Sequence, residues 1–139
     1  MRIGLISDTH GQLRPEVFSV FEGVDRILHA GDVGPEHILT ELATIAPVDA
    51  VIGNTDGWDL RAALPEQRIL TLEGRQIVLL HGHVLGSPTP IALRRLHPRA
   101  AVIVYGHTHV QKVDEGMPLV VNPGAAGPAR FKLKPSVAI

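Results

Sequence analysis

The sequence contains no cysteine, and its aromatic side chains amount to one Trp, one Tyr and three Phe among 139 residues. The lack of cysteine excludes disulfides, thiolate nucleophiles and cysteine-based zinc sites. Because aromatics make up only 4% of the chain, the 45% of hydrophobic residues must build an aliphatic core.

Neither sign of charge is in excess, because 13 Lys and Arg residues stand against 14 Asp and Glu residues. This balance excludes the broad basic surface that binds nucleic acid without sequence preference. No apolar run reaches the length of a membrane span, and the apolar stretch before Asp8 is too short for a signal peptide. We therefore expect a soluble, cytoplasmic protein without a membrane partner.

The length and the apolar content fit a single domain over residues 1–139, without repeats or linker-like segments. In the first half, short apolar runs alternate with segments of helical spacing. We expect strands at 2–6, 25–29 and 48–53, with helices at 14–22 and 34–45 between them. Strands separated by helices favour right-handed parallel connections and an α/β layer fold.

In the second half, pairs of apolar runs are joined by short turns. This pattern predicts two hairpins, which turn at Glu73-Gly74 and near Glu115-Gly116. Thr89 is a plausible N-cap for one more helix. The expected elements are a hairpin over 66–82, a helix over 87–96, a strand over 100–106, a hairpin over 110–124 and a last strand over 131–139. Together they predict a mixed sheet or a pair of sheets, parallel first and antiparallel later, with helices outside.

Polar side chains follow five of the predicted strands, usually beside a glycine. They are Asp8-Thr9-His10, Gly31-Asp32, Gly53-Asn54-Thr55-Asp56, His81-Gly82-His83 and Gly106-His107-Thr108-His109. In α/β sheets, ligands bind beyond the carboxyl ends of the strands. We therefore expect these groups to converge on one rim.

The residue types at this rim indicate a metal centre. Asp oxygens and neutral His nitrogens are common ligands of divalent transition metals, and one carboxylate can bridge two ions about 3.5–4 Å apart. In an extended segment residues i and i+2 point the same way, so D-x-H and H-x-H should act as local chelates. Glycines let the backbone pass close to such a centre. Each motif alone also fits a turn or a cap, but the whole series favours metal binding.

The same motifs, together with "HAGDV", "LLHGH", "YGHTH" and "NPG", resemble the calcineurin-like metallophosphoesterases, and in particular their small YfcE-type phosphodiesterase branch. The resemblance spans essentially the whole chain. It implies an α/β fold in which a two-sheet mixed β-sandwich is flanked by helices, in four layers αββα. It also implies a dinuclear, metal-dependent phosphoesterase.

The resemblance further implies which residues hold the metals. One ion would be held by Asp8, His10 and His109, and the other by Asn54, His81 and His107, with Asp32 and a hydroxide bridging them. That hydroxide would attack phosphorus in line. The family suggests Mn²⁺, while Ni, Co, Fe and Zn also suit ligands without sulfur.

Thr55 is a departure, because many family members have a catalytic His at this position. Thr cannot act as an acid near pH 7, which leaves three possibilities. Another group, such as His83, protonates the leaving oxygen, or the true substrate has a good leaving group, or turnover is slow and the protein has another role. His83 could equally be structural. Asp56 would orient an imidazole or, equally well, hold its own loop.

Other residues near the motifs are expected to have smaller roles. Asn122 and Gly124 form either a turn or a margin of the site. The remaining histidines, His29, His37 and His97, are expected to be structural or on the surface. Trp58 is expected to pack rather than to line a substrate cleft. Arg61 and Arg130 are candidate phosphate-binding cations.

The favoured function is hydrolysis of a small phosphodiester. The first alternative is a non-catalytic scaffold of the same fold, which would be expected to lose some metal ligands, whereas here all seven positions carry competent ones. The second is a phosphomonoesterase, which would need cations around the terminal phosphate. Exposed hairpins in the second half could also support a homo-oligomer.

Overall fold

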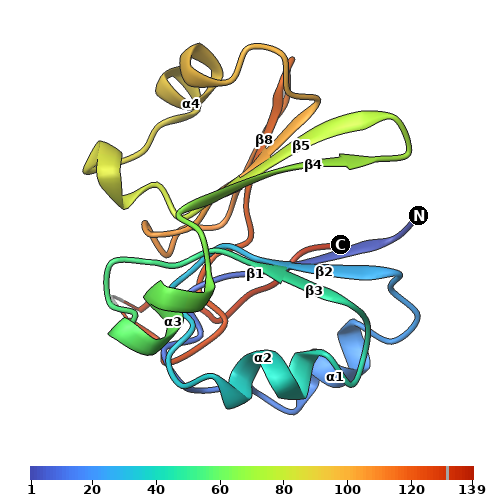
Figure 1. The fold of residues 1–139 in the computed structure, drawn as a ribbon, viewed down its shortest axis with the longest axis vertical. Helices are drawn as coiled ribbons and strands as arrows, with labels where there is room; N and C mark the ends of the chain where they lie inside the picture. The colour runs from blue at the N-terminus through green and yellow to red at the C-terminus, as the bar shows by residue number, and fades with distance from the viewer. Residues whose placement is uncertain (131) are drawn as a thin grey trace.

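Two β-sheets pack face to face in the computed structural model, which describes residues 1–130 and 132–139 (Figure 1). The first sheet has the order β1-β2-β3, and all its strands are parallel. Its strands are β1 (Ile3–Ile6), β2 (Arg26–His29) and β3 (Val48–Ala50), and its outer face carries α1 (Glu16–Val20) and α2 (His37–Leu42). The predicted strand–helix alternation is confirmed, with shorter helices than expected.

The second sheet has the order β4-β5-β6-β8-β7. Its strands are β4 (Gln67–Leu72), β5 (Arg75–Leu80), β6 (Val102–Val104), β7 (Lys112–Asp114) and β8 (Leu119–Asn122). Both predicted hairpins form, and the first turns through Glu73 and Gly74, each with positive φ. The predicted change to antiparallel pairing holds for β4–β5 and β7–β8 but not for the whole second half, because β5–β6 and β6–β8 are parallel.

In the described part of the chain there are three further short helices: α3 (Trp58–Ala63), the 3-10 helix η1 (His83–Leu85) and α4 (Pro90–Leu96). Thr89 caps α4 as predicted, because its side chain accepts a hydrogen bond of 3.2 Å from the Ala92 amide. The helix α3 was not expected from the sequence. The Trp58 side chain at its start is 83% exposed, so the expectation that it packs is wrong.

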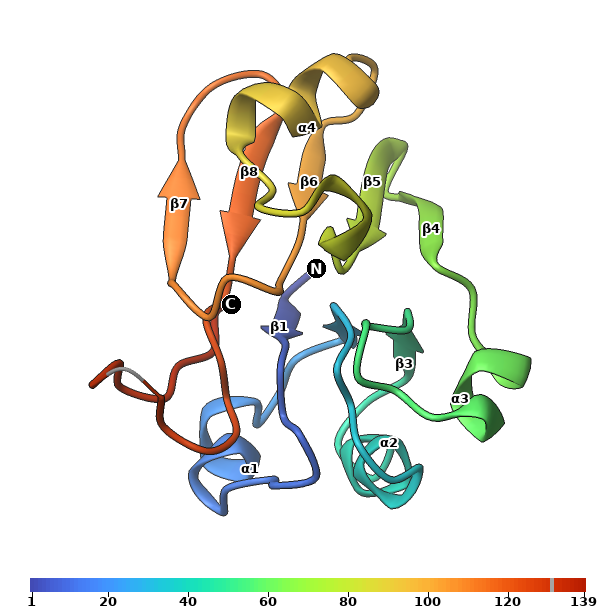
Figure 2. The same cartoon turned by 90° about the vertical axis from the view of Figure 1, so that its left-hand side faces the viewer.

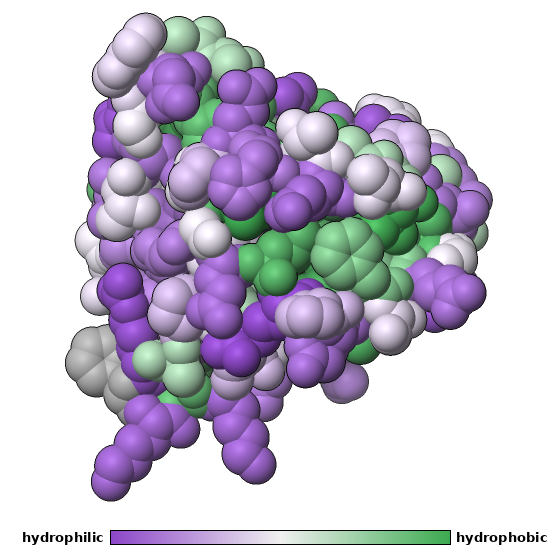
Figure 3. All heavy atoms as spheres, turned by 90° about the horizontal axis from the view of Figure 1, so that it is seen from below, coloured by the Kyte–Doolittle hydropathy of each residue, from purple (hydrophilic) through white to green (hydrophobic). Residues whose placement is uncertain are grey.

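Within the described residues the core is divided into three largely aliphatic clusters, which confirms the four-layer arrangement. One cluster, with Phe21 and Ile38, lies under the first sheet against α1 and α2. A second, with Leu28 and Leu79, fills the space between the sheets. The third, with Leu93, lies between the second sheet and α4. From the side of α1 and α2 the surface is largely hydrophilic, crossed by an apolar strip (Figure 3).

The expected last strand over 131–139 does not form within residues 132–139, while Phe131 lies outside the described residues. Only Ala138 pairs with the first sheet, through two hydrogen bonds with Leu5 of 2.8 and 3.0 Å. Pro135, three residues earlier, has no amide hydrogen to donate to a ladder.

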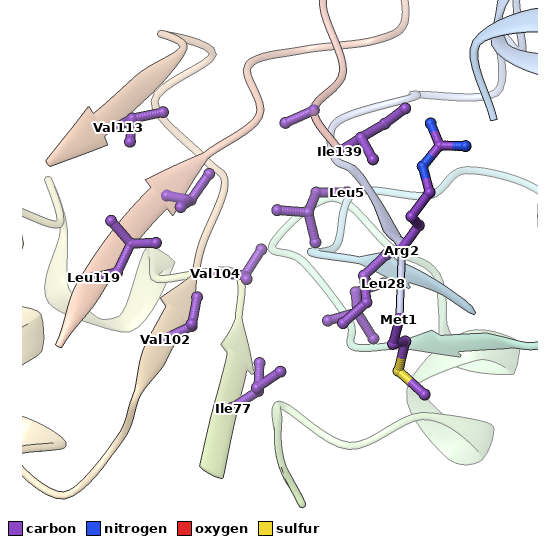
Figure 4. A pocket seen from close by; sticks show the side chains of 13 residues that line it. Met1, Arg2, Leu5, Leu28, Ile77, Val102, Val104, Val113, Leu119 and Ile139 are labelled. Carbon is purple, nitrogen blue, oxygen red and sulfur yellow. The ribbon is translucent and has the colours of Figure 1, made fainter. Parts of the chain in front are cut away.

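An apolar groove of about 480 Å³ lies beside this bridge, between the two sheets (Figure 4). Leu5 and Leu28 of the first sheet face Ile77, Val102 and Val104 of the second across it. The predicted polar motifs lie elsewhere, on the edge of the molecule where the strands end. Figure 2 is viewed onto that edge.

Candidate metal centre

The predicted ligand residues meet at this edge in two groups. Asp8, His10 and His109 form the first group, and Asp32, His81 and His107 form the second. Within each group, the candidate ligand atoms lie within 4.8 Å of one another. Asn54, the seventh predicted ligand, joins the second group through a contact of 3.1 Å between its Oδ1 and His81 Nε2.

The first group is centred on the carboxylate of Asp8. Its Oδ1 lies 3.2 Å from His109 Nε2 and 3.6 Å from His10 Nε2, and the two imidazole nitrogens are 3.3 Å apart. Asp8 Oδ1 is buried and has no hydrogen-bond partner among the described residues. Buried polar atoms are almost always satisfied, so lone pairs converging in this way fit a bound cation.

Asp32 joins the second group to the first. Its Oδ2 lies 3.2 Å from His81 Nε2 and 3.7 Å from His10 Nε2. The Asp8 carboxylate also reaches across, with Oδ1 3.9 Å from His81 Nε2. Asp32 Oδ2 therefore faces an imidazole of each group, as a bridging ligand must.

The aspartates of the two ligand groups, Asp8 and Asp32, are held in their ionised form. Burial alone would raise the pKa of Asp8, but His10 and His109 outweigh it and hold that pKa far below its ordinary value. Burial likewise opposes ionisation of Asp32, whose pKa is nevertheless lowered by His81 and by the Thr55 amide. Burial would lower the pKa of His81, but Asp32 and Asp8 raise it. The centre therefore concentrates negative charge where imidazole nitrogens point.

The backbone at the ligands is left-handed rather than extended. Positive φ angles occur at five of the seven ligands, namely Asp8 (53°), His10 (46°), Asp32 (54°), His107 (71°) and His109 (64°). The expectation that D-x-H and H-x-H chelate as extended segments is therefore wrong. Asp8 and His10 still share a group, but His107 and His109 point into different groups. Non-glycine residues rarely adopt this conformation, and such strain clusters at functional sites.

Neighbouring groups fix the orientation of the carboxylates. Asp8 Oδ2 accepts hydrogen bonds from the Ser7 hydroxyl at 2.6 Å and from the His107 amide at 3.1 Å. Asp32 Oδ1 accepts from the Thr55 amide at 2.9 Å. In each aspartate one oxygen is anchored, and the other is left facing the imidazoles.

Two glycines allow the close approach of these loops. A Cβ at Gly53 would collide with the Asp32 carboxylate, and a Cβ at Gly106 would collide with the Ser7 hydroxyl. The predicted role of glycines beside the centre is confirmed at these two positions. Any larger residue would displace a predicted ligand or its anchor.

Asp56 holds loops together. Its carboxylate is buried and accepts hydrogen bonds from the amides of Gly34 at 3.1 Å and Gly53 at 2.8 Å. Arg61 supports the same loop, because its guanidinium donates to the carbonyls of Asp56 and Asn54 at 2.8 and 3.2 Å. The arrangement matches the alternative in which Asp56 holds its own loop, and it commits Arg61 to the backbone.

Asn122 supports the loop that carries His107 and His109. Its Nδ2 donates to the Gly106 carbonyl at 3.1 Å and to the Thr108 hydroxyl at 2.9 Å. Its Oδ1 accepts from the Gly124 amide at 2.9 Å. The "NPG" segment therefore lies at the margin of the site and shapes the ligand loop.

His29 lies behind the centre, fully buried, and joins the loops that follow β1 and β2. The Gly31 amide donates to its Nδ1 at 3.1 Å, and its Nε2 lies 3.0 Å from the Thr9 hydroxyl. Because that hydroxyl donates its hydrogen to the Val33 carbonyl, it must accept from His29 Nε2–H. His29 is therefore structural, as expected. The role of Thr9 was missed, because only the fold brings it to His29.

The remaining predicted residues surround the centre. His83 belongs to neither ligand group, but its ring lies 5.4 Å from that of His81 and 6.4 Å from that of His107. Its pKa is lowered, first by burial and then by His81. Thr55 and Arg130 line the opening of the centre. Exposed His37 is the first residue of α2 and lies beside Glu41, and His97 follows α4.

Comparisons with known proteins agree with this geometry. The sequence model of the calcineurin-like phosphoesterase superfamily domain matches residues 1–139. A probable metallophosphoesterase of Methanothermobacter thermautotrophicus is 37% identical over 147 residues, covering 100% of this chain and 84% of its own. A phosphodiesterase of Methanocaldococcus jannaschii is 28% identical over 144 residues, covering 89% of this chain and 83% of its own.

Among solved structures, Vps29 of Entamoeba histolytica complexed with Zn²⁺ superposes with a TM-score of 0.80 at 26% identity. The match covers 98% of this chain and 81% of that one. It confirms the predicted two-sheet architecture. Within the described part of the chain, no helix has both the length and the apolar character needed to cross a membrane.

Proposed function

Because the chain belongs to the calcineurin-like phosphoesterase superfamily, we propose that it is a phosphodiesterase that uses two divalent metal ions. The observation that carries this proposal is the pair of ligand groups with Asp32 between them. One group would consist of Asp8, His10 and His109, and the other of Asn54, His81 and His107. Mn²⁺ is the first candidate, while Ni, Co, Fe and Zn also suit these nitrogen and oxygen donors.

When bound, two such ions supply a hydroxide near neutral pH and neutralise charge that develops on the phosphoryl group. The chain contributes the fixed positions of the donors. The Ser7 hydroxyl and the Thr55 amide each anchor one carboxylate, so the ligand set is preorganised. His81 donates its Nδ1–H to the Ala30 carbonyl at 2.7 Å, which leaves the lone pair of Nε2 facing the centre.

A diester is favoured over a monoester by the number of cations at the opening. Arg130 lines the opening, but the Arg61 guanidinium is occupied by two backbone carbonyls. A phosphodiester carries one negative charge, whereas a monoester carries up to two and would benefit from further cations. Arg130 would therefore suit the single charge of a diester.

The leaving oxygen also needs a proton, which Thr55 cannot supply as an acid near pH 7. His83 is our proposed donor, because it lies beside the rings of His81 and His107 without belonging to either ligand group. Lowering of the His83 pKa by burial makes its protonated form the stronger acid.

The alternative is a non-catalytic interaction module, which the similarity to Vps29 keeps open. The first experiment would measure hydrolysis of bis(p-nitrophenyl) phosphate and p-nitrophenyl phosphate by metal-stripped protein. Mn²⁺, Ni²⁺, Co²⁺, Zn²⁺ or Mg²⁺ would be added back and the bound metal counted.

We expect two ions per chain and faster turnover of the diester. Two bound ions without turnover of either ester would favour the interaction module. Faster turnover of the monoester would contradict the substrate assignment, and absence of bound metal would overturn the site.

A further inference from the structure

A second cavity, of about 350 Å³, lies next to the metal centre between η1, the end of α4 and the start of β4. Its volume is within the range of pockets that hold small organic ligands. His83 is part of its wall. Because the His83 ring also lies beside His81 and His107, this residue separates the cavity from the second ligand group.

The walls of this cavity differ in charge from the opening of the metal centre. Leu80, Leu85 and Leu96 make its walls apolar, and Glu66 supplies their one formal charge. The cation Arg130 instead lines the opening beside the ligands. An anionic phosphoryl group is therefore favoured at the opening, and an uncharged group is favoured in the cavity.

His83 also has hydrogen-bonding capacity that the described residues do not use. Its Nδ1 is buried and has no partner among them. Because this nitrogen is buried, a group in the cavity can reach it only if the His83 ring turns.

We propose that this cavity binds the leaving group of the diester, and that it selects an uncharged, ring-sized alcohol or phenol. This inference rests on the proposed phosphodiesterase function. Water supplies the oxygen that bonds to phosphorus, the ester bond to the group in the cavity breaks, and the departing oxygen takes a proton. Leu85 and Leu96 pack on the ring, whereas Glu66 repels a leaving group that carries a carboxylate or a second phosphate.

The test compares two diesters that differ in the charge of their leaving group. These are methyl 4-nitrophenyl phosphate and methyl 3-carboxy-4-nitrophenyl phosphate, assayed with the protein in its most active metal form. We expect kcat/KM to be about tenfold higher for the uncharged leaving group, since Glu66 faces the added carboxylate. Glu66→Lys should remove or invert this preference, whereas Glu22→Lys, the same charge change on an exposed residue outside the cavity, should keep it.

A second pair of variants tests the location without a change of charge. Leu96→Trp should fill the cavity and raise KM for both esters several-fold. Ile91→Trp is the matched control, because Ile91 is exposed on the same helix and does not line the cavity.

If wild type and Glu66→Lys hydrolyse the esters with the same preference between the uncharged and the carboxylated leaving group, the leaving-group site is wrong and the phosphodiesterase function still stands. Equal effects of Leu96→Trp and Ile91→Trp would also overturn the leaving-group site. Failure of the wild type to hydrolyse either ester with any metal would overturn both proposals.

Discussion

The last residue of β2 and the loop that follows β5 each place a fully buried histidine near the same aspartates, yet the two histidines differ in what they can do. His29 uses both ring nitrogens, with Nδ1 accepting from the Gly31 amide and Nε2 donating to Thr9. His81 donates its Nδ1–H to the Ala30 carbonyl. Its Nε2 faces Asp32 and Asn54 and is open to a metal.

The pKa values of His29 and His81 also differ, because the two rings have different neighbours. Burial lowers the pKa of His29 to about 4, since Asp8 and Asp32 only partly offset it. The pKa of His81 is raised despite burial, because Asp32 and Asp8 lie closer. His29 and His81 are thus the same residue type and are equally buried. They differ in the partners of Nε2, which make His29 structural and leave His81 a candidate ligand.

The largest expected effect comes from removing the charge that the two ligand groups share. Asp32→Asn should weaken binding of both ions, because the bridging oxygen then belongs to a neutral amide. We expect kcat/KM on bis(p-nitrophenyl) phosphate to fall by more than about 100-fold, with bound metal below two ions per chain. Asp49→Asn is the matched control, since Asp49 pairs with Arg26 outside the centre. Unchanged metal content in Asp32→Asn would contradict the bridging assignment.

The comparison between the two histidines is tested directly by the same substitution at each. His81→Leu should lose one ion, whereas His29→Leu should keep two. His29→Leu should instead lower the free energy of unfolding of metal-free protein by about 1–3 kcal/mol, because the Gly31 amide loses its acceptor. Metal analysis and urea denaturation in EDTA provide the two readouts. Equal metal loss in both variants would show that His29 is needed for metal binding as well.

A smaller and more specific effect is expected in the pH dependence of stability. The pKa of His29 is about 4 in the folded chain and 6.5 in the unfolded chain, so the unfolded chain binds the proton first as pH falls. The contribution of neutral His29 to the free energy of unfolding is therefore complete above pH 6.5 and is lost progressively as the pH falls to about 4. This loss amounts to about 3 kcal/mol at most. The difference between wild type and His29→Leu, both metal-free, should decline over this window, and a constant difference would refute the account.

Much of the candidate site was predictable because the residue type alone shows whether a side chain can bind a metal ion. The seven predicted ligands follow β1, β2, β3, β5 and β6, and the structure brings them to one edge because the carboxyl ends of these five strands meet there. The family resemblance supplied the proposal that they are divided between two ions. What could not be predicted was the left-handed backbone at five ligands, which depends on contacts such as that of the His107 amide with Asp8.

The fold, like the site, was predictable in part. Apolar periodicity located the strands and both hairpins, whereas the parallel pairing of β6 with β5 and β8 and the short α3 were missed. Strand neighbours are chosen by packing between sheets, and that choice leaves little trace in a local pattern. The exposed Trp58 is a similar case, because its hydrophobic side chain by itself predicted burial.

The sequence by itself determined which chemical groups are available: carboxylates and imidazoles at strand ends, no thiol, and no histidine at position 55. Only the tertiary structure decided how each group is used. Thr9 reaches His29, Arg61 is committed to carbonyls of its own loop, and His83 stands between the metal centre and a second cavity. The physical reason is that the free lone pairs of a side chain depend on its other contacts, and those contacts come from residues far apart in the chain.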